Sequence, residues 1–203
     1  MPDVANPVPL SPRARSLHFN SLVIDTHVDT TQRLLGPRFS LGHRHPDGSV
    51  DIPRLREGGV SAIFFAVWTP GTVTGPAAVQ RALDQIEAVH RQIDLHPDDL
   101  ALATTAQDIR EARASGHIAI LLGIEGGHLI NSDLAVLARY HSLGARYMTL
   151  THTLNVEWAD ASTDKPAHNG LTDFGKQVIR QMNRAGMMVD ISHVSDKTFH
   201  DAL

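Results

Sequence analysis

The sequence predicts a parallel α/β fold from two observations: short apolar runs recur along the chain, and helix-like segments separate them. The runs are rich in β-branched residues and do not alternate with polar ones, which is typical of strands buried on both faces of a parallel sheet. Five runs have this character, at residues 22–24, 60–68, 118–122, 147–150 and 187–191.

The segments between the runs carry helix signals. Apolar residues recur at helical spacing after Pro76, and Thr105 with Asp108 forms a capping pair for a second helix before the third run. Residues 132–133 open a further helix, and Gly144 stands where its C-terminal cap belongs. This alternation is compatible with a doubly wound sheet and with a barrel.

The end of the sequence falls within a βα unit. A helix that ends at Gly186 precedes the fifth run, and residues 195–203 have the pattern of a helix that has just begun. A closed (β/α) barrel needs eight strands. We therefore expect a single partial barrel domain over residues 1–203, truncated after about five strands, with residues 1–20 as an N-terminal extension and 21–203 as the first five βα units. An open five-stranded, doubly wound domain is the alternative.

Composition excludes several classes of protein. The 203 residues are 42 % hydrophobic and 20 % charged, with a formal net charge of -4, so we expect a globular protein that binds no nucleic acid. The N-terminal segment lacks the apolar core of a signal peptide, and no stretch reaches the roughly 18 apolar residues of a membrane span. We therefore expect a cytoplasmic protein without a membrane anchor. Because there are 13 histidines and no cysteine, any metal must be held by imidazole and carboxylate.

Ionisable residues follow four of the five apolar runs. His27 and Asp29 follow the first run, Glu125 the third, His152 the fourth and His193 the fifth. The carboxyl ends of parallel strands meet at one edge of a sheet, so we expect these side chains to converge. His27 and Asp29 are two residues apart in an extended segment and point the same way, so they could hold one cation.

Each of these residues alone also has an ordinary structural interpretation. A His-x-Asp pair can simply be hydrogen bonded at a strand end, and the glycines after Glu125 suit a tight turn as well as a bound ligand. His152 could be a core histidine, or it could donate a hydrogen bond to developing negative charge. His43 and His45 are expected on a surface loop, and His128 beside the ligands. The hypothesis of a metal site therefore depends on the fact that ionisable residues follow four of the apolar runs.

Taken together, the motifs resemble those of the renal (membrane) dipeptidase family. The resemblance is carried by residues 24–29 (Ile-Asp-Thr-His-Val-Asp), 123–126 (Gly-Ile-Glu-Gly), 150–160 and 190–193 (Asp-Ile-Ser-His), in that order and spacing. It implies a (β/α)8 TIM barrel of the metal-dependent hydrolase type. It also implies a zinc-dependent dipeptidase, in which metal-activated water hydrolyses the peptide bond of a small dipeptide.

The resemblance assigns a role to each candidate residue. His27 and Asp29 would bind one zinc ion, Glu125 would bridge two, and His193 would help to bind the second. Glu125 and His152 would be catalytic, with His152 at the substrate carbonyl and Asn155 also binding substrate. The family uses a further histidine, an arginine and an acidic residue that would all lie beyond the end of this sequence. We therefore expect an incomplete second zinc site and impaired activity in this chain.

Further expectations concern partners and alternative functions. A dipeptide is the expected small-molecule partner, and a homodimer is one assembly that the sequence allows. Another binuclear amidohydrolase, acting on a cyclic amide or ester, would typically begin with His-x-His and bridge its metals with a modified lysine; this chain has His-x-Asp and no lysine before Lys165. A non-catalytic fragment is the other alternative, which the missing strands favour and the intact first site opposes.

Overall fold

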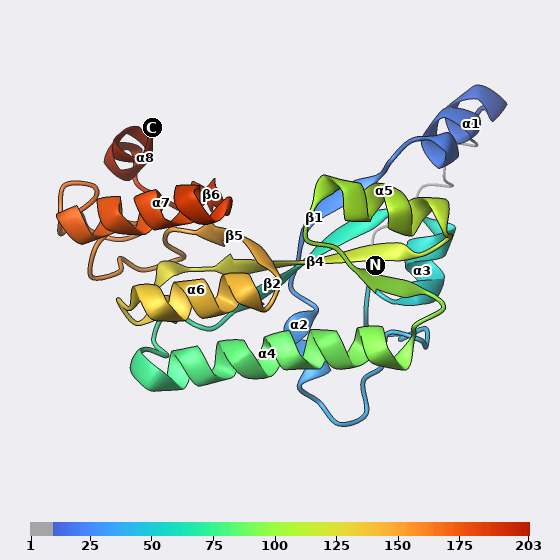
Figure 1. Cartoon of the computed structure of the whole chain (residues 1–203), viewed down its shortest axis with the longest axis horizontal. Coiled ribbons are helices and arrows are strands. Elements are labelled where there is room, and N and C mark those ends of the chain that lie inside the picture. Colours follow the sequence, from blue (N-terminus) through green and yellow to red (C-terminus); the bar gives the residue numbers. More distant parts are fainter. Residues whose placement is uncertain (1–9) are drawn as a thin grey trace, which may run out of the picture.

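The computed structural model describes residues 10–203, in which the apolar runs form one parallel sheet (Figure 1). The strands pair in the order β1-β2-β4-β5-β6, and every pair is parallel. The bounds are β1 Ile24–Val28, β2 Ala62–Trp68, β4 Ile118–Glu125, β5 Ala145–Thr149 and β6 Met188–Asp190. The predicted parallel α/β fold is confirmed.

Two strand assignments differ from the prediction. A sixth strand, β3 (Leu100–Leu102), pairs with the first half of β4; with three residues it is too short to give an apolar run. The first strand begins where the predicted run ends and continues through the polar residues Asp25 to His27, because β1 lies at a sheet edge and is largely exposed. His27 and Glu125 therefore lie within strands rather than after them.

Helices cover the sheet, and most begin or end at the predicted caps. Thr105 and Asp108 form the capping box of one helix, Asp133 caps the next, and Gly186 ends another in a left-handed conformation with φ 72°. The helices are α1 Pro12–Asn20, α2 Thr31–Leu34, α3 Ile52–Glu57, α4 Gly75–Leu95, α5 Ala106–Ala114, the 3-10 turn η1 Gly127–Ile130, α6 Leu134–Ser142, α7 Asp173–Ala185 and α8 Asp196–Ala202.

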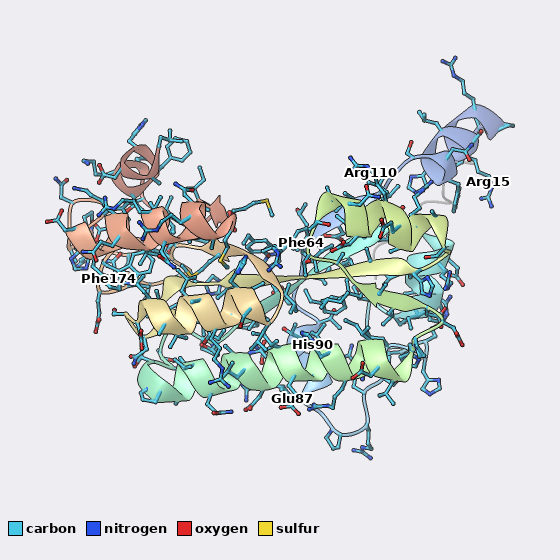
Figure 2. The ribbon with its side chains drawn as sticks, in the orientation of Figure 1. Arg15, Phe64, Glu87, His90, Arg110 and Phe174 are labelled. Carbon is cyan, nitrogen blue, oxygen red and sulfur yellow. The ribbon has the colours of Figure 1, made fainter. Side chains whose placement is uncertain are left out.

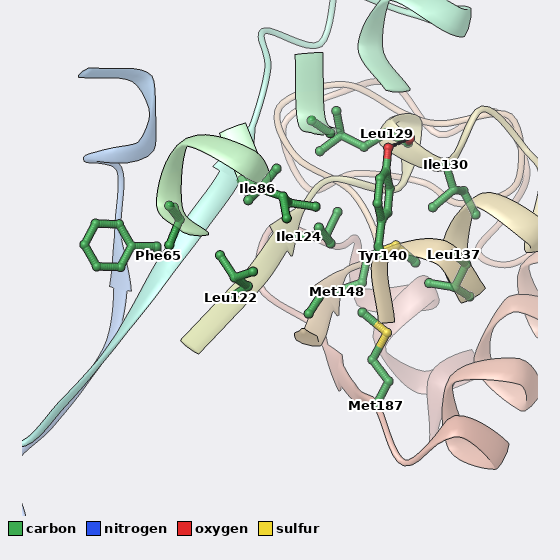
Figure 3. Packing of buried hydrophobic residues seen from close by; sticks show 14 of the residues in the cluster. Phe65, Ile86, Leu122, Ile124, Leu129, Ile130, Leu137, Tyr140, Met148 and Met187 are labelled. Carbon is green, nitrogen blue, oxygen red and sulfur yellow. Dashed lines mark hydrogen bonds between the residues drawn. The ribbon is translucent and has the colours of Figure 1, made fainter. Parts of the chain in front are cut away.

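The main hydrophobic core lies between one face of the sheet and helices α4, α6 and α7. Strand side chains alternate between faces, and on β4 the residues Leu122 and Ile124 point into this core. There they join Ile86 of α4 and Tyr140 of α6, all of them buried (Figure 3). This packing holds β4 in the middle of the sheet.

The opposite face is covered only at its amino-terminal half. A second cluster there unites Phe64 of β2, Leu121 of β4 and Tyr147 of β5 with Ile109 and Ala112 of α5. In Figure 1, α5 and α4 lie on opposite sides of β4, and in Figure 2 Phe64 lies on the α5 side. The carboxyl-terminal half of this face carries polar side chains instead.

The two ends of the described chain lie far apart (Figure 1). Helix α1 projects from the body at the opposite end of the molecule from α8 (Figure 1), and none of its residues is buried. Within residues 10–203, no helix combines the length and apolar character needed to cross a membrane. The cytoplasmic location stays a prediction.

Candidate metal centre

Glu125, the last residue of β4, lies at the centre of a cluster of histidines. Its Oε2 is 3.4 Å from Nε2 of His27, while its Oε1 is 3.3 Å from Nε2 of His193 and 3.5 Å from Nε2 of His152. Nε2 of His27 is also 3.3 Å from Oδ1 of Asp29. The structure thus brings together the five side chains that follow or end the strands, and their roles stay predictions.

These side chains form two groups of three metal-ligand atoms that share Glu125. One group contains His27, Asp29 and Glu125, and the other contains Glu125, His152 and His193; within each, the ligand atoms lie within 4.8 Å of one another. The Glu125 side chain is 6 % exposed, so its carboxylate is available only to groups inside the cluster. A single buried carboxylate therefore offers one oxygen to each group.

The spacing of the ligand atoms suits a divalent cation. Two atoms that are each about 2.05 Å from a tetrahedral zinc ion are roughly 3.3 Å apart. The four separations in the cluster are 3.3–3.5 Å, whereas a direct charge-assisted N–H···O bond is about 2.7–2.9 Å long. Imidazole nitrogens and carboxylate oxygens, with no thiolate, are also ligands that zinc accepts. The residues present therefore fit a metal centre.

His27 is oriented by a residue that the sequence did not single out. The hydroxyl oxygen of Tyr147 lies 3.1 Å from Nδ1 of His27. Gly123 is opposite Tyr147 in the register of β4 and β5, and a Cβ at position 123 would overlap the tyrosine ring. Burial raises the pKa of Tyr147, and the nearby carboxylates of Asp190 and Glu125 raise it further. The phenol therefore stays protonated and can serve as a hydrogen-bond partner.

The charges within the cluster stabilise one another. The contact with the Glu125 carboxylate raises the pKa of His27 to about 8, against the opposing effect of burial, and the negative charge of Asp29 adds to the rise. Burial alone would raise the pKa of Glu125, but the interactions with His27, His152 and His193 lower it. At neutral pH, Glu125 is therefore ionised and His27 carries a proton. A cation at Nε2 of His27 would replace that proton.

His193 has an unusual backbone conformation. Its φ is 66°, a left-handed conformation that costs a non-glycine residue on the order of 1 kcal/mol. The conformation is held by two hydrogen bonds to the carbonyl oxygen of His193, from the Thr151 hydroxyl at 3.0 Å and from the Ser162 amide at 2.8 Å. Such strain persists where surrounding contacts impose it, and it is concentrated at functional sites.

His152 is held between two other rings. It meets Trp68 edge-on at 6.0 Å and His193 edge-on at 4.9 Å between ring centroids. Nδ1 of His152 and Nε1 of Trp68 are buried and have no hydrogen-bond partner among the described residues. An unpaired buried polar group costs about 1–3 kcal/mol, and in native proteins such groups point to function or to bound water.

Asn155 and the remaining histidines lie outside the two groups. The Asn155 side chain accepts a bond from the Ala161 amide at 2.7 Å and donates one to the Lys165 carbonyl at 2.6 Å, so it fastens the loop after β5. Asn155 lines a separate cavity of about 260 Å³ together with His128. Its role in binding substrate stays a prediction. Among the described residues, neither His43 nor His45 belongs to a metal-ligand group.

A cavity of about 430 Å³ opens beside the cluster. His27, Glu125 and His193 line it together with Phe64 and Tyr147. Further lining residues come from β6 and the turn after it: Met188, Val189, Asp190 and Ser192. Small-molecule sites commonly occupy about 300–1,000 Å³, so the cavity can hold a ligand of a few residues next to the candidate metal ligands.

Histidine and carboxylate ligands at the carboxyl ends of parallel strands are typical of metal-dependent hydrolases built on (β/α) barrels. The sequence matches the family model described as membrane dipeptidase, peptidase family M19, over residues 11–203, and the chain belongs to this family. The candidate metal-ligand cluster of this chain agrees with membership of a peptidase family that uses a metal.

Known dipeptidases share much of this sequence. Dipeptidase 3 of Rattus norvegicus is 39 % identical over 159 residues, which are 76 % of this chain and 32 % of that protein. Dipeptidase aclJ of Aspergillus oryzae is 41 % identical over 159 residues, 73 % of this chain and 37 % of that protein. The chain thus covers well under half of the length of these relatives.

Solved structures support the barrel-type fold. A crystal structure described as dipeptidase AC, a metallopeptidase of family M19, superimposes with a TM-score of 0.80 and 27 % identity, covering 89 % of this chain and 59 % of that one. A metallopeptidase from Rhodobacter sphaeroides, liganded with a phosphinate mimic of the dipeptide L-Ala-D-Ala, gives a TM-score of 0.77 at 24 % identity, covering 89 % of this chain and 61 % of that one. The fold class predicted from the sequence is confirmed, with the sheet present as part of a barrel.

Proposed function

We propose that residues 1–203 carry the metal-binding portion of a metal-dependent dipeptidase, and that the whole protein hydrolyses the peptide bond of dipeptides. The observation that carries the proposal is the buried carboxylate of Glu125, which presents one oxygen to His27 and the other to His152 and His193. The names of the relatives, which are dipeptidases, support the substrate class.

The proposed metal content is two zinc ions that share Glu125. The ligand atoms have the spacing and chemistry of zinc ligands, and two groups of three are present. When bound, a pair of such ions lowers the pKa of water and polarises the carbonyl of an amide.

The residues of the chain have separate tasks in this proposal. His27, Asp29 and Glu125 would hold a cation beside the cavity, and Tyr147 fixes the ring of His27. His152, held by Trp68, donates a hydrogen bond to the carbonyl oxygen of a bound dipeptide, where negative charge develops. Phe64 and Met188 supply apolar surface to the cavity.

A zinc-dependent release of amino acids from dipeptides tests the proposed function. The longest natural chain that contains residues 1–203 is freed of metal, reloaded with zinc, and incubated with L-Ala-L-Ala and L-Ala-D-Ala while free amines are measured. We expect hydrolysis that chelation abolishes, and at least a 100-fold loss in Glu125→Gln. Zinc-bound, folded protein that hydrolyses neither dipeptide would refute the proposal, and hydrolysis of a cyclic amide in their place would favour the amidohydrolase alternative.

A further inference from the structure

We propose that Asn169 is a site of spontaneous deamidation, and that a hydrogen bond from the Gly170 amide to Asp160 sets how fast this modification occurs. Asn169 and Gly170 form the only Asn-Gly pair of the sequence. Asparagine is a thermolabile residue. It reacts most readily before glycine, which has no side chain to hinder attack by its own backbone nitrogen on the asparagine side chain. The inference lies outside the proposed metal centre and does not depend on it.

The modification needs only water as a co-reactant. The backbone nitrogen of Gly170 loses its proton to solvent and attacks Cγ of Asn169. The new N–Cγ bond closes a five-membered cyclic imide, the bond from Cγ to the side-chain nitrogen breaks, and this nitrogen takes a proton from solvent and leaves as ammonia. Water then opens the imide at either carbonyl, which leaves aspartate or isoaspartate at position 169. The net change replaces an amide by a carboxyl group, which is ionised at neutral pH.

Asn169 is open to solvent, whereas the attacking nitrogen is already bonded. Asn169 is an exposed residue with φ 52°, a left-handed conformation that asparagine adopts more readily than most residues. Gly170 is buried and has φ 103°. Its N–H donates a 2.9 Å hydrogen bond to Oδ2 of Asp160. The structure therefore exposes the reacting side chain but restrains the nitrogen that must attack it.

Asp160 opposes the attack in two ways. Its carboxylate also accepts hydrogen bonds from the amides of Ala167 at 2.9 Å and His168 at 3.0 Å, so rotation of the Asn169 backbone toward the attacking geometry breaks bonds to Asp160. The same carboxylate lies against the Gly170 nitrogen, which must become negatively charged before it attacks, and like charges repel strongly at this distance. The reaction therefore proceeds from an open form of the loop, in which these hydrogen bonds are broken.

The modified loop cannot keep its contacts with α8. Isoaspartate adds a methylene group to the main chain just before Gly170, where the Asp201 side chain leaves no room even for a Cβ. The Leu171 amide donates a 3.0 Å hydrogen bond to Oδ2 of Asp201, and this bond shifts with Gly170. A carboxylate at position 169 also adds negative charge to a cavity of about 390 Å³ that Asp164 and Asp196 already line. Deamidation should therefore loosen the attachment of α8 and destabilise the chain.

Peptide mapping by mass spectrometry follows the reaction at Asn169. The chain is incubated at mildly alkaline pH, either folded or unfolded in guanidinium chloride, beside Asp160→Asn and the matched control Asp164→Asn. Asp164 lies in the same loop, but it accepts a bond from the Asn155 amide and none from Gly170. We expect deamidation to be at least about tenfold slower in folded than in unfolded wild type. Folded Asp160→Asn should recover most of this difference, and Asp164→Asn should match wild type.

Two further measurements define the product and its effect. Isoaspartate among the products identifies the cyclic imide, because direct hydrolysis of the asparagine side chain gives aspartate alone. Deamidated chain, separated on an ion-exchange column by its additional negative charge, should melt at a lower temperature than unmodified chain. Circular dichroism establishes that each variant is folded.

Hydrogen exchange of the Gly170 amide tests the protection by Asp160 without any variant. The N–H must leave Asp160 before it exchanges, as it must before the nitrogen attacks, so we expect slow exchange in folded wild type. This measurement replaces the comparison with Asp160→Asn if that variant does not fold. Fast exchange at Gly170 together with slow deamidation would overturn the role of Asp160.

The outcomes separate the parts of the inference. No deamidation of Asn169 in the unfolded chain would overturn the site itself. Equal rates in folded and unfolded wild type would overturn its protection by the fold, and equal rates in folded wild type and folded Asp160→Asn would overturn the role of Asp160. An unchanged melting temperature of the deamidated chain would overturn the effect on α8.

Discussion

Replacing Tyr147 by phenylalanine removes one oxygen atom and should weaken metal binding by the first group. The hydroxyl oxygen of Tyr147 lies 3.1 Å from Nδ1 of His27, whose Nε2 faces Glu125. When Nε2 binds a cation, Nδ1 carries the proton, and Tyr147 accepts its hydrogen bond and fixes the tautomer. Losing such a partner typically lowers metal affinity about 10- to 100-fold, which corresponds to roughly 1.4–2.8 kcal/mol at 25 °C.

The assay is a competition titration of zinc against a chelator of known affinity, together with urea unfolding of the metal-free protein. Tyr140→Phe is the matched control, because Tyr140 is equally a buried tyrosine and its hydroxyl donates a 2.7 Å bond to the Leu129 carbonyl in the main core. Both variants should lose about 0.5–1.5 kcal/mol of unfolding free energy, but only Tyr147→Phe should lose zinc affinity. Unchanged zinc affinity in Tyr147→Phe, or equal losses in both variants, would refute the reasoning.

Three more predictions concern the contact between Gly123 and Tyr147, the metal cluster, and the loop after β5. Gly123→Ala should displace the Tyr147 ring, costing about 1–3 kcal/mol of stability and reducing zinc affinity in the same titration; a neutral substitution would contradict the close approach. Zinc should stabilise chelator-treated protein by about 2.7 kcal/mol at a free zinc concentration 100 times the Kd, which a higher melting temperature would report. Glu125→Gln should abolish most of this stabilisation. Asp160→Asn should lose about 1.5–3 kcal/mol, because the buried carboxylate accepts backbone N–H bonds from residues 167, 168 and 170. Burial opposes ionisation of Asp160, but these hydrogen bonds lower the pKa of its carboxyl group below the ordinary value. The stabilisation by ionised Asp160 is therefore complete above the pKa of the unfolded chain and is lost as the pH falls through the lower pKa of the folded protein. The difference in melting temperature between wild type and Asp160→Asn should shrink from pH 6 to pH 3.

Local sequence signals predicted which side chains come together, because the signals repeat at one structural position. His27, Asp29, Glu125, His152 and His193 each lie at or just after the carboxyl end of a strand, and parallel topology alone brings such ends together. The structure places all five in one cluster. What the spacing could not give is which oxygen of Glu125 each imidazole faces, because that depends on the three-dimensional positions of the side chains.

Supporting residues escaped prediction because their partners are distant in sequence. Tyr147 reaches His27 only through the register that sets it opposite Gly123 on the neighbouring strand. A glycine two residues before Glu125 and an aromatic residue two before Thr149 were the available signals, and neither is informative until the strands are paired. Helix α1 escaped for another reason: it buries no residue, so its sequence has no apolar periodicity to detect.

Helix α5 covers only the amino-terminal half of one sheet face, so substitutions at the two ends of a strand have different consequences. At the amino-terminal half, Phe64 and Leu121 are tied to the volume of Ile109 and Ala112, so a substitution there changes how well the protein folds. At the carboxyl-terminal half, Glu125 and the histidines around it form a charged cluster of candidate metal-ligand atoms, so a substitution there changes the charge and the spacing of that cluster. The loops around the cavity can therefore be changed without disturbing the packing at the amino-terminal ends of the same strands, which maintains the fold.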